Sequence, residues 1–419
     1  MKKILVLSHS SSIGGGELAL KSLIESTIAD YDWTIAFPTS AAPDPAILPD
    51  NVHVEAFDDL QWWCHEVNEL PRRLDKTAFK RSYERLSRLA KDYDVLVTNT
   101  LTIPWLGFIA QQIGKPHIWY VHEFGDIDHN LQFIAGYETS LKMIDECSSR
   151  VLTISDAVRS HIGRVINPDK IDIIHQSVDF KALSTIPPID TGGAFTSYLA
   201  MGAIKPSKGQ KIAADAFTSF DEGTLNIIGP AADGSYVEDI KNSLSKGSGV
   251  KVEIRRYNPK EELPRHQVVL MCSENEGLGR VTLEALAAGR VVVGYDCPST
   301  RELLGQSRGI LYSPNTPEAL NETLRRLPAL TKNINLESAR SYVIKTYSDT
   351  AQSIDFTACV NRAFDHPIDK SNRAYCFYIR TIAESNLWQT NVSKLRKKVL
   401  KIIPSRAKRL LKRSVGVRR

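Results

Sequence analysis

The sequence has few of the features that mark a secreted, zinc-binding or membrane-spanning protein. Its six cysteines are scattered without C-x-x-C or metal-ligand spacing, which favours a reducing compartment and argues against zinc. Each is expected to be a small buried apolar side chain. The N-terminal apolar run, Ile4–Leu7, is too short for a signal peptide, and no run reaches the roughly 18 apolar residues of a membrane span. We therefore expect a cytoplasmic protein.

The net charge of +5 is unevenly distributed. Residues 394–419 hold twelve Lys or Arg and no acidic residue, so the rest of the chain is net acidic. A length of 419 residues exceeds what one hydrophobic core normally serves, which predicts two domains. An apolar content of 42% and a charged content of 24% are typical of globular rather than disordered proteins.

Strand-like segments alternate with helical patterns along most of the chain, which predicts an α/β fold with two largely parallel sheets. We expect an N-terminal Rossmann-like domain over residues 1–183, a Pro- and Gly-rich linker over 184–196, a C-terminal Rossmann-like domain over 197–365, and a helical, basic tail over 366–419. Two doubly wound domains joined by a hinge predict a ligand in the cleft between them. The expected strands are residues 3–7, 34–37, 52–57, 95–98, 117–121, 151–154, 171–174, 198–201, 225–228, 251–254, 268–271 and 291–294.

The most informative stretch is Ser273–Gly289, in which Glu276 and Glu284 stand eight positions apart around a Gly-Leu-Gly turn. If a helix begins just after Gly279, Glu284 lies on the helix and Glu276 in the loop at its positive end, so both carboxylates can face one ligand. The turn offers backbone N–H groups without Cβ obstruction, which suits a phosphate or a sugar oxygen. The flanking apolar runs place the motif at the carboxyl end of a strand, where open α/β sheets bind ligands. Taken alone, such a Glu pair more often marks a solvated helical face.

From Asn275 to Gly289, with the following Val-Val-Val and Glu302, the sequence resembles the signature of the large E-x7-E family of retaining GT-B glycosyltransferases, the glycosyl transferases of group 1 and family 4. The resemblance extends from about residue 1 to about residue 364 and is strongest over 266–312. It implies the GT-B fold, with two Rossmann-like domains facing across a cleft. It also implies a metal-independent hexosyltransferase whose donor substrate is a nucleotide diphosphate sugar and which needs no cofactor.

The same resemblance implies roles for the residues of the motif. Glu276 and the amides of Gly277, Leu278 and Gly279 would hold the donor sugar, and Glu284 would bind the ribose hydroxyls. Catalysis would then be electrostatic rather than covalent, because no protein nucleophile is required.

Two glycine-rich turns after predicted strands could approach the diphosphate. In the first, Gly15 and Gly16 match the family's Gly-Gly loop, which borders the diphosphate and the acceptor; a tight βα turn explains the same residues equally well. In the second, Lys208 matches a lysine that neutralises the leaving diphosphate, but Ala203 stands where the family has an arginine. We expect Arg280, beside the Gly-Leu-Gly turn, to supply the missing charge, since its fork of donors suits a diphosphate. The alternative is an ordinary solvated arginine at a helix start.

His122 follows a predicted strand and matches a histidine that family members direct at the donor sugar. Without the resemblance, a lone histidine is more often structural than catalytic. Three D-x-D triplets, beginning at Asp30, Asp92 and Asp126, could suggest the metal-bound diphosphate site of a different glycosyltransferase fold. The first two precede predicted strands, where aspartate is common in turns, and we favour a metal-independent enzyme.

Two departures from the family pattern leave the sugar unpredicted. The usual Gly-Gly ahead of Glu302 is Pro298-Ser299 here, and the proline usual after Gly289-Arg290 is Val291.

Two basic segments suit an anionic membrane surface. Residues 71–91 carry eight basic residues interleaved with aromatic and aliphatic ones, and residues 394–419 repeat the pattern at helical spacing. The alternatives are a solvated helical face and a disordered tail. Because amphipathic spacing has no purpose in a purely electrostatic tail, we favour a membrane over a nucleic acid as the polyanion.

The sequence thus predicts a retaining glycosyltransferase that acts on a glycan or lipid-linked acceptor, peripheral at the inner face of the membrane, in cell-surface polysaccharide or lipid-linked glycan synthesis. The catalytic residues would be Glu276 and His122. A nucleotide-sugar 2-epimerase on the same fold and a non-enzymatic polyanion-binding protein are the alternatives. Donor base, sugar, acceptor, linkage and oligomeric state are not predicted.

Overall fold

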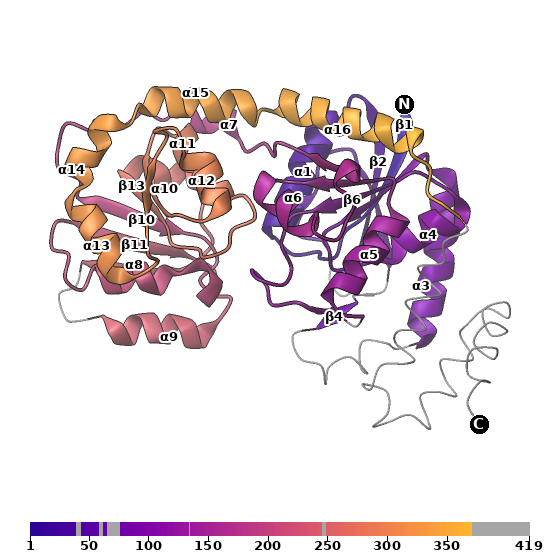
Figure 1. Ribbon diagram of the computed structural model, residues 1–419, viewed down its shortest axis with the longest axis horizontal. Coiled ribbons are helices and arrows are strands. Elements are labelled where there is room, and N and C mark those ends of the chain that lie inside the picture. Colours follow the sequence, from indigo (N-terminus) through magenta and orange to yellow (C-terminus); the bar gives the residue numbers. More distant parts are fainter. Residues whose placement is uncertain (39–42, 58–61, 65–75, 134, 245–248, 371–419) are drawn as a thin grey trace, which may run out of the picture. The chain divides into compact units, whose positions relative to one another are not determined.

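The computed structural model describes most of the chain as two compact units (Figure 1). Of the described residues, the first unit comprises those in Met1–Thr153, Arg159–Ile174 and Ser353–Lys370, and the second comprises those in Ile154–Val158 and His175–Gln352. The basic segment 394–419 and residues 71–75 lie outside the described residues. Backbone alone is described for residues 63, 64 and 76–82. The described residues are 1–38, 43–57, 62–64, 76–133, 135–244 and 249–370.

A seven-stranded parallel sheet forms the centre of the first unit, in the order β3-β2-β1-β5-β6-β8-β9. Its central strands are fully buried and rich in Val, Ile and Leu, as expected for parallel strands covered on both faces. All seven strands coincide with predicted ones. Their bounds are β1 Lys2–Leu7, β2 Tyr31–Pro38, β3 His53–Phe57, β5 Val95–Asn99, β6 His117–Val121, β8 Arg150–Thr153 and β9 Ile171–Ile173.

Helices connect these strands. Two short strands, β4 Trp63–Cys64 and β7 Gln132–Phe133, form a separate antiparallel pair that was not predicted from the sequence. Next to that pair, Trp62 stacks on Trp119 at a centroid distance of 5.9 Å and meets Phe108 and Phe133 edge to face. The helices are α1 Gly15–Thr27, α3 Lys76–Leu89, α4 Trp105–Ile113, α5 Tyr137–Cys147 and α6 Asp156–Ile162, with 3₁₀ turns η1 Pro45–Ile47, η3 Ala90–Asp92 and η4 Pro168–Lys170.

The second unit has a six-stranded parallel sheet in the order β12-β11-β10-β13-β14-β15. The run Val291-Val292-Val293 in β14 is fully buried, because β-branched side chains fill both faces of a covered strand. Five strands match the predicted ones, and β15 was not predicted. Their bounds are β10 Ser197–Met201, β11 Thr224–Gly229, β12 Val250–Ile254, β13 Val268–Met271, β14 Val291–Tyr295 and β15 Ile310–Tyr312.

The helices of the second unit pack around that sheet (Figure 1). Its core joins Tyr198, Phe217 and Phe220, whose rings meet edge to face, with the apolar strands. The helices are α7 Phe180–Leu183, α8 Gln210–Ala216, α9 Gly234–Ser243, α10 Pro259–Glu262, α11 Arg280–Ala287, α12 Pro298–Leu304, α13 Pro317–Arg325, α14 Leu327–Leu330 and α15 Leu336–Thr346, with 3₁₀ turns η5 Pro206–Lys208, η6 Leu263–Arg265 and η7 Thr331–Asn333. One more helix, α16 Asp349–Asp365, begins in this unit and continues in the first.

The last helix, α16, differs from the expected domain boundaries. Residues 353–365 were expected in the C-terminal domain, but they pack on the first unit. Phe356 is fully buried there and stacks on Trp33 at a centroid distance of 5.3 Å, and Arg362 pairs with Asp172 at 2.8 Å. Burying one such aromatic side chain is worth about 2–3 kcal/mol, which fixes the helix on this unit. The expected linker, 184–196, contains no helix or strand.

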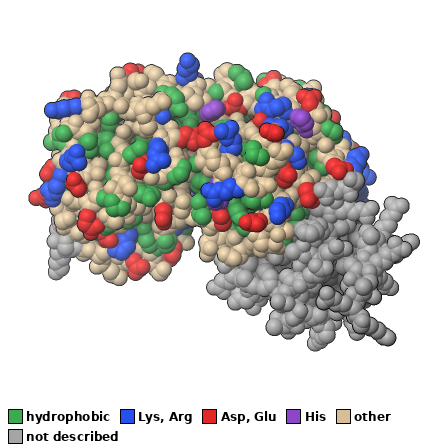
Figure 2. Space-filling view, in the orientation of Figure 1, with side chains coloured by type: hydrophobic (Ala, Val, Ile, Leu, Met, Phe, Trp, Pro, Cys, Tyr) green, Lys and Arg blue, Asp and Glu red, His purple; other side chains and the backbone are tan. Residues whose placement is uncertain are grey.

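The face of the molecule shown in Figure 2 carries charges of both signs. On the face shown in Figure 2, Lys and Arg side chains are interspersed with Asp and Glu side chains. In α3, Arg85 pairs with Glu55 and donates to the carbonyl of Ala56.

No helix in the described part of the chain is both long and apolar enough to cross a bilayer. Four cysteines are buried free thiols, as predicted, namely Cys147, Cys272, Cys297 and Cys359.

Candidate active site

Strand order explains why residues distant in the sequence meet in the second unit. The sheet of the second unit begins with β10 at its centre. The strands β11 and β12 follow on one side of β10, and β13, β14 and β15 then follow on the other side. The loops that follow β10 and β13 therefore leave neighbouring strands at the point where the winding direction reverses. Such switch points are where open α/β sheets bind ligands. Lys208 follows β10 and Glu276 follows β13, so topology brings this cation and this carboxylate together.

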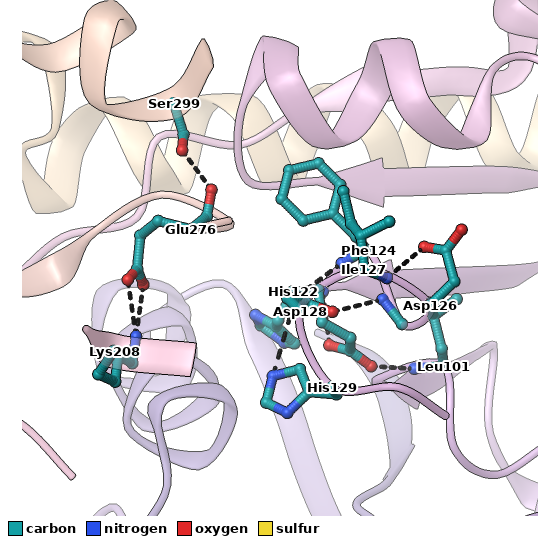
Figure 3. Close-up of polar contacts among 12 residues, drawn as sticks. Leu101, His122, Phe124, Asp126, Ile127, Asp128, His129, Lys208, Glu276 and Ser299 are labelled. Atoms are coloured by element: carbon teal, nitrogen blue, oxygen red, sulfur yellow. Dashed lines mark hydrogen bonds and ion pairs between the residues drawn. The ribbon is translucent and has the colours of Figure 1, made fainter. Parts of the chain in front are cut away.

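Lys208 and Glu276 form a two-pronged ion pair (Figure 3). The Lys208 ammonium donates to both carboxylate oxygens of Glu276, at 2.9 and 2.7 Å. The loop that carries Lys208 packs closely against Cys272, which follows β13. This packing requires glycine at position 209, because a Cβ there would lie 2.2 Å from the carbonyl oxygen of Cys272. The Glu276 side chain is 14% exposed and that of Lys208 is 31% exposed, so the pair is only partly screened by water.

Charge outweighs burial in setting the ionisation of Glu276. Burial by itself would raise the pKa of this carboxyl, but the Lys208 ammonium and a hydrogen bond from Ser273 hold the pKa below its ordinary value. Glu276 is therefore a carboxylate at neutral pH and can accept hydrogen bonds from sugar hydroxyls.

The segment Glu276–Gly279, here named the donor loop, leads into α11 as the sequence predicted. Gly279 adopts φ +90°, a conformation that favours glycine, and a Cβ at this position would lie 3.2 Å from Oγ1 of Thr282. Gly277, Leu278 and Gly279 are all buried. The helix begins at Arg280, so the loop lies at the positive end of a helix dipole.

Glu284 lies on α11 as predicted, in surroundings unlike those of Glu276. Burial raises its pKa to about 7, and the nearby Arg280 guanidinium only partly opposes this rise. Arg280 donates from Nη1 to the carbonyl of Ser177 at 3.1 Å. Tyr257, in the loop after β12, belongs to the same charged neighbourhood: burial raises the pKa of its hydroxyl, as do the charges of Glu284 and Glu276. The half-buried Arg280 is thus partly engaged by the protein itself.

A second group of predicted residues lies at the carboxyl edge of the first unit's sheet. The turn after β1 carries Gly15 and Gly16, which begin α1, and His122 follows β6. A Cβ on Gly16 would lie 3.4 Å from Thr100 and 3.5 Å from the His122 ring, so the turn packs directly beside this histidine. Gly15 has open space at its Cβ position.

Asn99, at the end of β5, holds the His122 ring. The Nε2 atom of His122 lies 2.7 Å from Oδ1 of Asn99, and because a carbonyl oxygen only accepts, Nε2 carries the proton. The Asn99 amide in turn donates to the Ser8 hydroxyl at 3.3 Å, and that hydroxyl donates to Glu17 at 3.4 Å. Asn99, Ser8 and Glu17 are buried, so the network is shielded from water.

Carboxylates shape the loop that follows His122. Glu123 accepts from the backbone N–H of Leu101 at 2.7 Å and of His122 at 3.1 Å, and burial raises its pKa to about 7. Asp128 accepts from the N–H groups of Phe124 and Gly125 at 3.0 and 2.8 Å (Figure 3).

Asp126 and Asp128, the third D-x-D triplet, are used within this loop. Asp126 pairs with His161 at 2.8 Å, while Asp128 holds the backbone of the turn. The described residues contain no group of three or more His, Cys, Asp or Glu side chains arranged to hold a metal ion.

The structure assembles two sets of predicted residues. In the second unit it brings together Lys208, Glu276, the donor loop, Arg280 and Glu284; in the first it brings together Gly16 and His122. The residues that hold or neighbour these site residues, namely Asn99, Ser8 and Tyr257, were not predicted from the sequence. Asn99 and Ser8 carried a usable signal, since polar residues at the carboxyl ends of predicted strands face the ligand edge of the sheet. Tyr257 carried none.

Comparison with known proteins gives matches over both halves of the chain. The family model described as Glycosyltransferase Family 4 matches residues 13–182, and the one described as Glycosyl transferases group 1 matches residues 194–343. A search of curated protein sequences gives no significant match.

Several solved structures share the fold at low identity. Anabaena HepE in complex with UDP and glucose is 18% identical, with a TM-score of 0.68 over 86% of this chain and 100% of that one. A glycosyltransferase from Rickettsia africae is 14% identical, with a TM-score of 0.69 over 87% and 98%. The lipopolysaccharide outer core galactosyltransferase WaaB is 16% identical, with a TM-score of 0.65 over 86% and 99%. The chain therefore belongs to the glycosyltransferases of group 1 and family 4, and its two Rossmann-like sheets are those of the GT-B fold.

Proposed function

We propose that this glycosyltransferase moves a hexose from a nucleotide diphosphate sugar to a hydroxyl of a glycan or lipid-linked acceptor, with retention at the anomeric carbon and without a metal ion. The observation that carries the proposal is the site after β10 and β13, where Lys208, Glu276 and the amides of the donor loop converge. Such a site offers a cation for phosphate and both a carboxylate and N–H groups for sugar hydroxyls.

The chemistry requires charge stabilisation more than covalent participation. In the step we propose, the acceptor oxygen forms a bond to C1 of the sugar while the bond from C1 to the diphosphate oxygen breaks. The acceptor proton passes to that departing oxygen on the same face, which preserves the configuration. Lys208 offsets the charge that develops on the diphosphate, with Arg280 as a second cation, and Glu276 holds the sugar.

The remaining site residues have supporting roles in this proposal. Glu284 accepts hydrogen bonds from the ribose hydroxyls, and His122, held by Asn99, orients the sugar. Gly15 and Gly16 allow the backbone of the first unit to approach the diphosphate and the acceptor. Anabaena HepE, crystallised with UDP-glucose, supports a nucleotide sugar as the donor.

A mass-spectrometric screen tests the reaction. The purified chain is incubated with individual nucleotide sugars, with and without cell-envelope glycolipid extracts, in EDTA and in added divalent cation. Acceptor-dependent consumption of one donor, unchanged by EDTA, is the expected result, and NMR of the product gives the anomeric configuration. Conversion of the donor without an acceptor would show epimerase activity instead. If every donor stays intact and the Glu276→Ala variant behaves like the wild type in all assays, the proposal is wrong.

We further propose that the protein works at the inner face of a membrane, bound through residues 71–91 and 394–419. The support is their basic, amphipathic sequence, together with WaaB, whose name refers to lipopolysaccharide. Cosedimentation should occur with vesicles containing anionic phosphatidylglycerol and not with phosphatidylcholine alone, and deletion of 394–419 should weaken it. Binding to duplex DNA at equal strength would favour a general polyanion site over a membrane site.

A further inference from the structure

Serine hydroxyls hold two successive carbonyls of the donor loop. The hydroxyl of Ser299 donates to the carbonyl oxygen of Glu276 (Figure 3), and that of Ser155 donates to the carbonyl oxygen of Gly277 at 2.6 Å. Both serines are buried, with exposed fractions of 1% and 0%. Neither bond has competition from water, so each fixes one peptide plane of the loop.

The orientation of a carbonyl determines that of the amide on the same peptide unit. In a trans peptide the C=O and N–H groups point in opposite directions. With the Glu276 carbonyl turned to Ser299, the N–H of Gly277 faces away from Ser299. With the Gly277 carbonyl turned to Ser155, the N–H of Leu278 faces away from Ser155. These are two of the amides assigned to the donor under the proposed function.

The Ser299 bond is a property of this chain rather than of the sequence pattern it resembles. That pattern has Gly-Gly where this chain has Pro298-Ser299, and glycine has no hydroxyl to donate. Pro298 begins α12 and Ser299 is its second residue, so the short helix delivers the hydroxyl to the loop. Ser155 lies in the part of the chain that crosses into the second unit, and its hydroxyl also accepts from the N–H of Val158 at 3.1 Å, at the start of α6.

We propose that Ser299 and Ser155 are positioning residues for the donor, whose hydroxyls lock the donor loop with its amides directed at the diphosphate sugar. The proposal rests on the proposed function for the identity of the ligand. It deepens that function by assigning donor affinity to two side chains that need not touch the donor. Because loop geometry is set before the donor arrives, loss of a hydroxyl weakens donor binding more than the chemical step.

Hydrogen exchange of the protein without ligand tests the positioning itself. In Ser299→Ala, the peptides that cover Gly277 and Leu278 should exchange faster than in the wild type, while the strands of the second unit stay protected. Ser243→Ala is the matched control, since its hydroxyl donates to the carbonyl of Ile240 at 2.9 Å in α9, away from the loop. Unchanged exchange at the loop in Ser299→Ala would overturn the proposal without any reference to activity.

Donor kinetics test the consequence. With UDP-glucose, or the nucleotide sugar that the screen identifies, Ser299→Ala and Ser299→Gly should each raise KM about five- to tenfold with kcat changed less than twofold, as expected for one lost hydrogen bond. Ser155→Ala should do the same and also lower the melting temperature, because it removes the cap of α6. Ser243→Ala should keep the wild-type KM. If the wild type binds donor and both serine variants match it, the positioning role is wrong; if the wild type binds no nucleotide sugar, the proposed function itself fails.

Discussion

Replacing Glu284 by glutamine should remove the pH dependence of donor binding. The pKa of Glu284 is about 7 because of burial, against 4.5 for an ordinary glutamate. At pH 6 about one tenth of the molecules carry the carboxylate, and at pH 8 about nine tenths do. A carboxylate accepts from two ribose hydroxyls, whereas the protonated acid does so less well. Affinity for donor should therefore rise about tenfold between pH 6 and pH 8 in the wild type and stay nearly flat in Glu284→Gln.

The assay is isothermal titration with UDP-glucose, whose diphosphate has no titrating group in this range. Glu123→Gln is a matched control, because burial also raises the pKa of Glu123 to about 7, but this residue lies in the first unit at the loop after β6. The control should keep the wild-type pH profile. A rise in affinity with pH that persists in Glu284→Gln, or that disappears in Glu123→Gln, would refute the assignment of Glu284 to the donor.

The same substitution has a consequence for stability with a defined sign. The folded state holds the Glu284 proton up to about pH 7 and the unfolded state only up to about pH 4.5, so this contribution to stability is present below pH 4.5 and lost as the pH rises through 7. At pH 8, Glu284→Gln should raise the free energy of unfolding by roughly 2–3 kcal/mol, as measured by urea denaturation. At pH 4 the two proteins should unfold at the same urea concentration.

Three other substitutions probe separate parts of the site. Lys208→Met should raise the donor KM about 10- to 100-fold and let the pKa of Glu276 rise, because burial is no longer offset by the ammonium; wild-type donor kinetics would contradict this. Gly279→Ala should lower stability by about 1–2 kcal/mol, since φ +90° strains alanine, and calorimetry measures the change in melting temperature. Asn99→Ala should lower kcat about tenfold, because His122 loses the acceptor that fixes its ring; nucleotide release measures kcat, and an unchanged kcat would show that Asn99 does not position His122 for catalysis.

The strands and the donor motif were predictable because short-range patterns encode them. Buried parallel strands read as apolar runs, and the start of α11 reads as a Gly-Leu-Gly turn before an amphipathic segment. The three-residue strand β15 and the two-residue strands β4 and β7 were not predicted, because segments so short show no periodicity in the sequence.

Contacts between distant residues were not predictable in the same way. The sequence suggests that Lys208 and Glu276 serve one ligand, but not that they bind each other across 68 positions. Ser299 was visible only as a departure from Gly-Gly, and nothing local shows that its hydroxyl reaches the Glu276 carbonyl. The return of α16 to the first unit is likewise invisible locally, since an apolar stripe does not reveal which sheet covers it.

The first unit is built from segments that lie far apart in the sequence, so it cannot complete its fold until late in translation. Tyr31 and Thr357, which bond through their hydroxyls, are separated by 326 positions, so the whole second unit must be translated before Trp33 can be covered by Phe356. Until then the nascent chain displays an aromatic surface of the kind that chaperones hold. A chain that stops at Gln352 is expected to aggregate through its first unit, even where its second unit folds.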